Sequence, residues 1–412
     1  NVGFLNPYSR ITFQLENVSA SSASNVRSCY PLGVGVSSLI ERVQLKVGGK
    51  TICEVDDFNH FQGYKSMFIA GEVNKEREQF LSCRQISHEQ FHEYDKNICT
   101  TLTLDNGKNY RQPNSEVRMN DFQLVDSKGV FSITLEELLP VFKYTALPLY
   151  LLNKDQAVQI ELFLSSSTDG SRIMVGNTGD ADTSHNVPMT LNRSECRMIA
   201  DYTTYDESLM QDYAQKNQNL SWTFMDYQLT KRSVNQADAQ NLIYNVGGAG
   251  RLVPRVFSAV GRDDLDFTQL LNKYSSSAPE LVGTTYGTLT TNIKKNDKFI
   301  YPIDRSNTAL HFHDVADAEG MTPFITRAEY SRQGQRTGNE TFFEKRKQID
   351  SLSGAFGYQA YKIVDGERVN SRGLEVHAKY VSLDATNYTI RTWIECIKVA
   401  VIQNGRFDCY YA

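Results

Sequence analysis

SSLIERVQLKVGGKTICEV, residues 37–55, alternates apolar and polar side chains on both sides of a Gly-Gly pair. Alternation with period two is typical of a strand with one buried face, and paired glycines supply the positive φ angles of a tight hairpin. NLIYNVGGAGRLVPRVFSAV, residues 241–260, follows the same plan around a second Val-Gly-Gly. The two stretches lie about half a chain length apart, so the sequence predicts the same antiparallel hairpin twice.

The rest of the chain also predicts strands more than helices. Alternation recurs at 11–15 and 158–164, while TIRTWIECIKVAVIQ (389–403) is apolar on both faces, as in a long strand covered on both sides. Helices are expected to be short and peripheral, at 56–68, 74–94, 205–217 and 265–274. Because the predicted strands and helices do not alternate along the sequence, a parallel α/β sheet is not expected.

The repeated hairpin divides the 412 residues into two similar halves. Each half also ends in a strongly apolar strand region, at 148–164 and at 391–402. We therefore expect an all-β protein with short peripheral helices, built from two tandem antiparallel sandwiches. The expected boundary follows the polar helix at 205–217, which gives a first domain at 1–217 and a second domain at 218–412.

Composition argues against several functional classes. The net charge of −5 does not favour general binding to phosphate backbones, and we interpret the basic run at 344–347 as solvated surface. The seven cysteines are scattered without CxxC spacing, which indicates neither a disulfide framework nor a zinc ribbon and fits a reducing compartment. No apolar run approaches the roughly 18 residues of a membrane span.

HEQFH, residues 88–92, matches the H-E-x-x-H pattern of helical zinc sites. Such a site needs a third ligand nearby. Apart from the adjacent Glu93, the nearest downstream glutamate is Glu116, in a stretch that reads as strand and turn around Pro113. We therefore interpret HEQFH as part of a surface helix and keep a zinc hydrolase only as a minor alternative.

The remaining chemical motifs also favour structural interpretations. HFH (311–313), if extended, places two histidines on one face beside Asp314, but no third ligand converges on them, and His377 stands alone. VGGAG (246–250) lacks the GK[ST] ending of a phosphate loop and is interpreted as a hairpin. No nucleophile elbow or dinucleotide fingerprint occurs. We predict no catalytic residue, no cofactor site and no metal site.

Several blocks of sequence, in their order and spacing, resemble the double jelly-roll major capsid proteins of virophages, polinton-like viruses and large DNA viruses. The blocks are YPLGVGVSSLIERVQLKVGGKTICEVDDFNHFQGYKSM (30–67), ALPLYLLNKDQAVQIELFL (146–164), NLIYNVGGAGRLVPRVF (241–257), KNDKFIYPIDRS (295–306) and VDGERVNSRGLEV (364–376). The resemblance is spread over nearly the whole chain, and no single motif in it is diagnostic.

The resemblance implies two eight-stranded jelly rolls and a homotrimer that forms a pseudo-hexagonal capsomer of an icosahedral shell. Its expected partners are neighbouring capsomers, penton and minor capsid proteins, and in many relatives an internal membrane. The expected location is the virion capsid, assembled inside the host cell, in the cytoplasm or a virus factory. No enzyme activity and no cofactor are implied. The amino-terminal stretch NVGFLNPYSR holds one arginine, so we expect no direct sequence-specific binding of nucleic acid.

A β-sandwich fibre or surface-ligand-binding protein is the alternative from another functional class. Such a module would present aromatic side chains on exposed loops, with Tyr286, Tyr330 and Tyr358 as candidates, although no aromatic cluster stands out in the sequence. The oligomeric state separates the two hypotheses, because a shell subunit forms a tight trimer.

Overall fold

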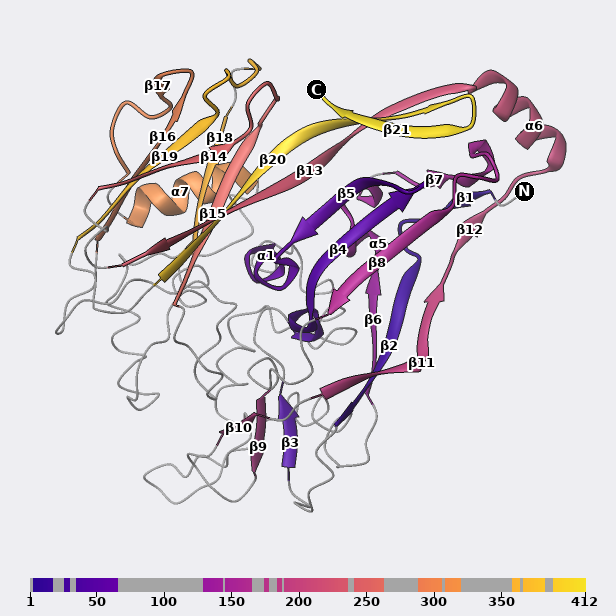
Figure 1. Cartoon of the computed structure of the whole chain (residues 1–412), viewed down its shortest axis with the longest axis horizontal. Coiled ribbons are helices and arrows are strands. Elements are labelled where there is room, and N and C mark those ends of the chain that lie inside the picture. The colour runs from indigo at the N-terminus through magenta and orange to yellow at the C-terminus, as the bar shows by residue number, and fades with distance from the viewer. Residues whose placement is uncertain are drawn as a thin grey trace.

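Antiparallel strands dominate the chain and form two sandwiches side by side, as a computed structural model shows (Figure 1). The structure describes residues 3–17, 26–29, 35–65, 129–143, 145–164, 174–177, 184–186, 189–235, 241–262, 288–305, 308–319, 358–363, 366–381 and 388–412. Helices are short, as the sequence predicts. The described part of the chain holds no helix long and apolar enough to cross a bilayer.

The first half forms four three-stranded sheets. The two larger ones have the orders β5-β4-β8 and β11-β2-β6, and the two smaller ones β12-β1-β7 and β10-β9-β3. The strands are β1 (Phe4–Leu5), β2 (Arg10–Asn17), β3 (Val26–Cys29), β4 (Ile40–Val47), β5 (Lys50–Asp56), β6 (Gly129–Thr134), β7 (Leu147–Pro148), β8 (Val158–Leu164), β9 (Met174–Asn177), β10 (Ser184–Asn186), β11 (Met189–Ile199) and β12 (Tyr202–Thr203).

Short helical segments connect these strands. They are η1 (Gly35–Leu39), α1 (Phe58–Lys65), α5 (Leu135–Leu138), η3 (Pro140–Phe142), η4 (Leu149–Leu151) and α6 (Glu207–Lys216). The helices predicted at 56–68 and 205–217 are confirmed as α1 and α6. Those predicted at 74–94 and 265–274 lie outside the described residues.

The hairpin predicted at the first Val-Gly-Gly is confirmed. Val47 pairs with Lys50, and the two residues between them, Gly48 and Gly49, have φ angles of 57° and 80°. Two consecutive residues with positive φ form the turn whose twist matches that of the flanking strands. The sequence thus predicts the turn, whereas the register of β4 and β5 shifts at a β-bulge between Leu45 and Lys46.

The second half forms a sandwich of two larger sheets. One contains β13-β20-β15-β18, with β21 also on β20, and the other contains β14-β19-β16-β17. The elements are β13 (Asn219–Val234), β14 (Leu242–Gly247), β15 (Arg255–Arg262), β16 (Thr288–Lys295), β17 (Lys298–Phe299), α7 (Thr308–Glu319), β18 (Tyr358–Lys362), β19 (Leu374–Val381), β20 (Tyr388–Gln403) and β21 (Arg406–Tyr411). Along much of this half the chain passes from one sheet to the other between successive strands.

The hairpin predicted at the second Val-Gly-Gly is wrong. β14 ends at Gly247 and pairs with β19, whereas β15 pairs with β18 and β20 in the opposite sheet. Gly247 and Gly248 have positive φ, but here they turn the chain across the sandwich. A Cβ on Gly248 would lie 3.3 Å from Ile394 Cδ1, so the crossing also needs a glycine for close packing.

Two hydrophobic cores fill the molecule. The second core lies between the two sheets of the second half and includes Tyr244, Val256 and Ile394. The first core contains Val43, Leu45, Phe131 and many other residues of the first half, but it also takes in residues of β13, β15, β20 and β21. The first sandwich is therefore closed in part by strands of the second.

β20 covers both cores, as its two apolar faces predict. Trp393 belongs to the first core and Ile394 to the second. Alternation places Ala400 and Ile402 on the face of Ile394, but they contribute to the first core instead. A strand of 16 residues twists along its length, so its carboxyl end presents that face to the first sandwich (Figure 1).

The β20–β21 hairpin reaches across to the first half (Figure 1). Its turn consists of Asn404 and Gly405, whose φ angles are 49° and 77°. The N–H of Asn153, between η4 and β8, donates a hydrogen bond of 2.8 Å to the carbonyl oxygen of Gly405. Phe407 of β21 is buried in the first core. The hairpin is thus a structural part of the first sandwich.

Candidate functional site

The most elaborate arrangement of polar and aromatic side chains lies where the two sandwiches meet. The segment 50–65 of the first half, which contains β5 and α1, faces β13, β15 and β20 of the second. We call this contact region the joint. Its side chains are brought together from segments far apart in the chain, so they fix how the halves are placed relative to each other.

An aromatic stack forms the apolar part of the joint. The ring of Tyr64 stacks on Phe257 at 4.4 Å, and Phe257 stacks on Trp393 at 5.5 Å. Phe61 meets Tyr227 edge-on at 4.7 Å. Contacts of this kind contribute about 0.5–1.5 kcal/mol each beyond the burial of their surface. The stack therefore resists sliding of α1 over the sheet.

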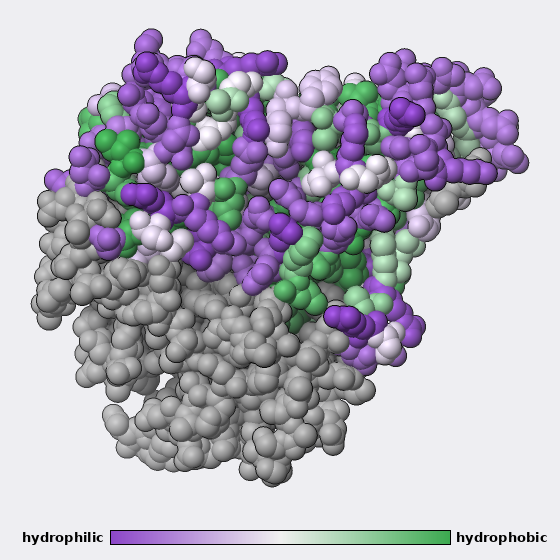
Figure 2. All heavy atoms as spheres, in the orientation of Figure 1, coloured by the Kyte–Doolittle hydropathy of each residue, from purple (hydrophilic) through white to green (hydrophobic). Residues whose placement is uncertain are grey.

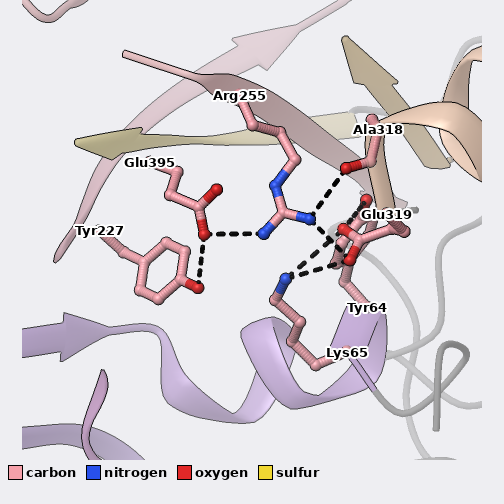
Figure 3. A network of polar contacts seen from close by, with 7 residues as sticks. All are labelled: Tyr64, Lys65, Tyr227, Arg255, Ala318, Glu319 and Glu395. Carbon is pink, nitrogen blue, oxygen red and sulfur yellow. Dashed lines mark hydrogen bonds and ion pairs between the residues drawn. The ribbon is translucent and has the colours of Figure 1, made fainter. Parts of the chain in front are cut away.

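Beside the stack lies a network of buried charges (Figure 3). Arg255 of β15 binds Glu319 at the end of α7 through Nη1 and Glu395 of β20 through Nη2, each at 2.7 Å. Lys65 Nζ lies 3.4 Å from Glu319 Oε1, and the hydroxyl of Tyr64 donates to the same oxygen at 2.7 Å. The charged side chains are only 7–18% exposed, so two cations and two carboxyl groups neutralise one another away from water.

The surroundings shift the pKa values within the network. Burial lowers the pKa of Lys65 to about 8, although Glu319 opposes the shift. Burial alone would raise the pKa of Glu319, but Lys65 and Arg255 outweigh it and hold that pKa below its ordinary value. Burial raises the pKa of Tyr227 well above its ordinary value, and nearby Glu395 raises it further. Tyr227 therefore stays protonated and donates its hydroxyl to Glu395 at 2.9 Å.

Two further polar contacts flank the network. Lys398 of β20 forms an ion pair of 3.2 Å with Asp226 of β13 and donates a hydrogen bond to the carbonyl oxygen of Ile52 in β5. Asp57, which precedes α1, binds Lys231 at 2.6 Å and Arg391 at 3.0 Å. The hydrogen bond from Lys398 to Ile52 and the two ion pairs of Asp57 each join the segment 50–65 to a strand of the second half. Polar contacts thus hold the segment 50–65 to the second half at several points along the joint.

The joint is suited to holding two bodies in a fixed geometry. Its carboxyl groups face cations and hydroxyls, and its lysines and tyrosines are hydrogen-bonded to those carboxyls. Among the described ranges of the chain, no three His, Cys, Asp or Glu side chains gather as metal ligands do. The arrangement stabilises the fold.

The extended conformation considered for HFH does not occur, because residues 311–313 lie in α7. His313 is exposed, and its Nδ1 lies 3.9 Å from Asp314. Asp314 instead accepts a hydrogen bond of 2.8 Å from Arg305.

Some of the other candidate residues lie among the described residues, and the rest lie outside them. His377 lies in β19, where its ring meets Phe299 edge-on at 5.0 Å. Tyr358 begins β18. HEQFH, Tyr286 and Tyr330 lie outside the described residues, so the zinc and ligand-binding alternatives stay predictions.

Four cysteines are free thiols: Cys53, Cys196, Cys396 and Cys409. Cys53 and Cys396 are buried, which raises their pKa values, to about 11 for Cys396. Cys196 and Cys409 are half-buried. The interpretation of these cysteines as small buried or free thiols is confirmed.

Comparison with known proteins identifies the fold. No family model matches the chain, and no curated protein matches it. Among solved structures, a chain of the PBCV-1 virus capsid is 11% identical and superposes with a TM-score of 0.58, covering 100% of this chain and 91% of that one. A chain of the Sputnik virophage, also 11% identical, gives a TM-score of 0.57 and covers 99% and 83%.

The chain has a double jelly-roll fold. The fold class predicted from alternation and from the order of the sequence blocks is therefore confirmed. The double jelly roll spans the whole chain, so both halves and the joint between them belong to the likeness. At 11% identity the likeness is one of fold.

Sequence reasoning missed the residues of the joint. It grouped Trp393 with apolar neighbours and gave no role to Arg255, Glu319 or Glu395. One signal was present: Arg255 and Glu395 each stand next to or among strongly apolar strand residues, where an unpaired charge is costly. Such a charge predicts a buried partner, but not which one.

Proposed function

We propose that this double jelly-roll chain is the major capsid protein of a virus and acts as the structural subunit of the shell. The observation that carries the proposal is the match in fold to a chain of the PBCV-1 capsid along the full length of this chain. The joint supports the proposal, because a subunit that tiles a shell has to keep a fixed shape under mechanical stress. A tandem held by buried charges and stacked rings meets that need.

The finer proposal is a homotrimer. Three chains with two similar sandwiches each supply six similar wedges and a pseudo-hexagonal capsomer that tiles an icosahedral shell. The proposed domains are 1–217 and 218–412. Among the described strands, none before residue 217 pairs with one after 218, and α6 ends just before this boundary at Lys216. Two sandwiches that lie side by side would supply two neighbouring wedges of the capsomer.

The proposed partners are neighbouring capsomers, penton and minor capsid proteins, and an internal membrane where one exists. Weak contacts repeated many times over a closed surface give a stable assembly. The chain would reside in the virion capsid after assembly inside the host cell. The proposed role needs no cofactor and no catalytic group, and it involves no sequence-specific contact with nucleic acid.

Size-exclusion chromatography with light scattering of the purified chain tests this proposal. We expect a particle of about three times the 46.7 kDa chain mass, and six-sided outlines by negative-stain microscopy. A monomer at all concentrations would contradict the shell role and favour a binding module. Metal analysis tests the remaining alternative, since stoichiometric zinc that is lost in His88→Ala would support a hydrolase.

A further inference from the structure

Exposed apolar side chains gather at two ends of the molecule. Hydrophilic residues cover most of the described surface in the view of Figure 2, and apolar ones form small groups rather than one broad face. Of the twelve exposed large hydrophobic side chains among the described residues, seven form what we call the helix patch: Tyr8, Met198, Ile199, Tyr202, Tyr205, Leu209 and Tyr213. Three others form the sheet patch: Ile243, Phe299 and Ile303.

The helix patch is an ordered surface. Tyr205, Leu209 and Tyr213 are spaced four residues apart, so they share one side of α6 and the turn before it. The ring of Tyr213 meets Phe4 and Tyr150 at 5.8 Å each, which fixes α6 against the first sandwich. The stripe is nevertheless open to solvent, since Leu209 is 58% exposed. A held helix with an uncovered apolar stripe is a typical docking element.

The sheet patch lies on the outer side of the sheet β14-β19-β16-β17. Ile243 of β14 pairs with His377 of β19, and the ring of His377 meets Phe299 of β17. Ile303 follows β17 and is 69% exposed. Figure 1 places this sheet and α6 at opposite ends of the long axis of the chain. One copy therefore cannot bring its own two patches together.

The two patches carry opposite charge. Residues 201–216 hold four acids, Asp201, Asp206, Glu207 and Asp212, against the single cation Lys216. Beside the sheet patch, Lys298 and Lys379 are exposed, while Lys294 pairs with Asp297 and Glu375 at 3.8 and 3.6 Å. These three lysines outnumber the two acids, and Lys295 is buried. Complementary charge steers association and fixes its orientation. The acidic patch therefore fits the basic one better than it fits itself.

We propose that the helix patch of one copy docks on the sheet patch of the next copy, head to tail. A contact between two different surfaces forms a ring when its rotation closes, unlike a contact of one surface with itself. This inference rests on the proposed shell function and adds the surfaces through which the copies meet. The occupant of each patch is thus a second copy of the same chain.

Charge reversal tests the pairing in the full-length chain. Asp201→Lys with Asp212→Lys reverses the helix patch, and Lys298→Glu with Lys379→Glu reverses the sheet patch; all four positions are exposed. We expect each double variant to raise the concentration at which half of the oligomer dissociates by about tenfold or more, and the quadruple variant to regain assembly. Unchanged thermal unfolding of isolated subunits in each variant shows that folding is intact.

The apolar part of the contact is tested by Leu209→Ser. Its matched control is Tyr410→Ser, because Tyr410 of β21 is also 58% exposed but lies in neither patch. We expect dissociation for Leu209→Ser alone. A wild-type monomer would overturn the shell function itself. A wild-type oligomer that resists all these changes, or that is weakened equally by Tyr410→Ser, would overturn the pairing of the patches while leaving the shell function standing.

Discussion

Glu319→Gln removes one charge from the centre of the joint while nearly preserving the shape of the side chain. In the wild type this carboxylate lies 2.7 Å from Arg255 and 3.4 Å from Lys65, and it accepts the hydroxyl of Tyr64. After the substitution Arg255 keeps Glu395, but Lys65 loses its ion-pair partner in a buried position. Because Glu319 raises the pKa of Lys65, its removal lets burial lower that pKa below the wild-type value of about 8, so the charged form of the lysine is disfavoured.

The size of the effect follows from the distances. With an effective dielectric constant of about 20, unit charges at 2.7 Å and 3.4 Å attract by roughly 6 and 5 kcal/mol. The cost of desolvating the carboxylate, several kcal/mol, offsets part of this attraction and is relieved in the variant. Breaking a buried pair by removing one partner costs about 3–5 kcal/mol, and we expect the free energy of unfolding to fall by that amount at pH 7.

The effect also depends on pH. The pKa of Glu319 is held below its ordinary value of 4.5 in the folded chain by Lys65 and Arg255, which outweigh the effect of burial. The stability contributed by its charge is therefore fully present above pH 4.5 and is lost as pH falls through the lower folded-state pKa. The difference between wild type and Glu319→Gln should shrink below pH 4.5.

Denaturant titration followed by tryptophan fluorescence measures this difference. The chain has only two tryptophans, and Trp393 lies in the joint, so the signal reports on the region that is changed. Asp408→Asn is the matched control, because its pair with Lys50 is more than 60% exposed on both sides and should contribute at most about 1 kcal/mol. A loss below 1 kcal/mol for Glu319→Gln would refute the role of the network.

Three further perturbations test other parts of the structure. Phe257→Ala should lower the free energy of unfolding by about 3–5 kcal/mol, because the ring is fully buried between Tyr64 and Trp393; a two-step denaturant transition would show that the halves have uncoupled. Gly405→Ala should cost at least about 1–2 kcal/mol in thermal unfolding, since it combines a positive φ with a Cβ that meets the side chain of Asn153. Cys53 should resist maleimide labelling in the native state and react only after unfolding, as peptide mass mapping would reveal; rapid native labelling would contradict its burial and raised pKa.

Local pattern predicted the architecture because alternation reports directly on which side of a strand is buried. It placed β4, β8 and β20, and the two glycines after Val47 predicted the turn of the first hairpin but not the β-bulge beside it. The second Val-Gly-Gly, at 246–248, led to a wrong hairpin prediction. Positive φ at glycine permits a hairpin and a crossing between sheets equally. Asn404 and Gly405, which do form a hairpin turn, are a stronger local signal that went unused.

The joint could not be predicted because its contacts depend on how whole sheets are placed. Lys65 and Glu319 are separated by 254 positions, and nothing in the sequence near either residue specifies the other. The twist of β20 has the same origin: alternation assumes a straight strand, whereas Ala400 turns toward the first core. The sequence does not predict the helix patch or the sheet patch, because the exposure of Leu209 or Ile243 depends on how the folded chain covers its surface.

Burial of Phe407 in the first core has a consequence for biosynthesis. The half that leaves the ribosome first lacks a strand that helps to close it until translation has reached Phe407. At about 5–20 residues/s, translation from Leu164 to Phe407 takes roughly 12–50 s. Throughout that time the nascent amino-terminal half exposes an apolar surface, which makes it a client for a chaperone holdase.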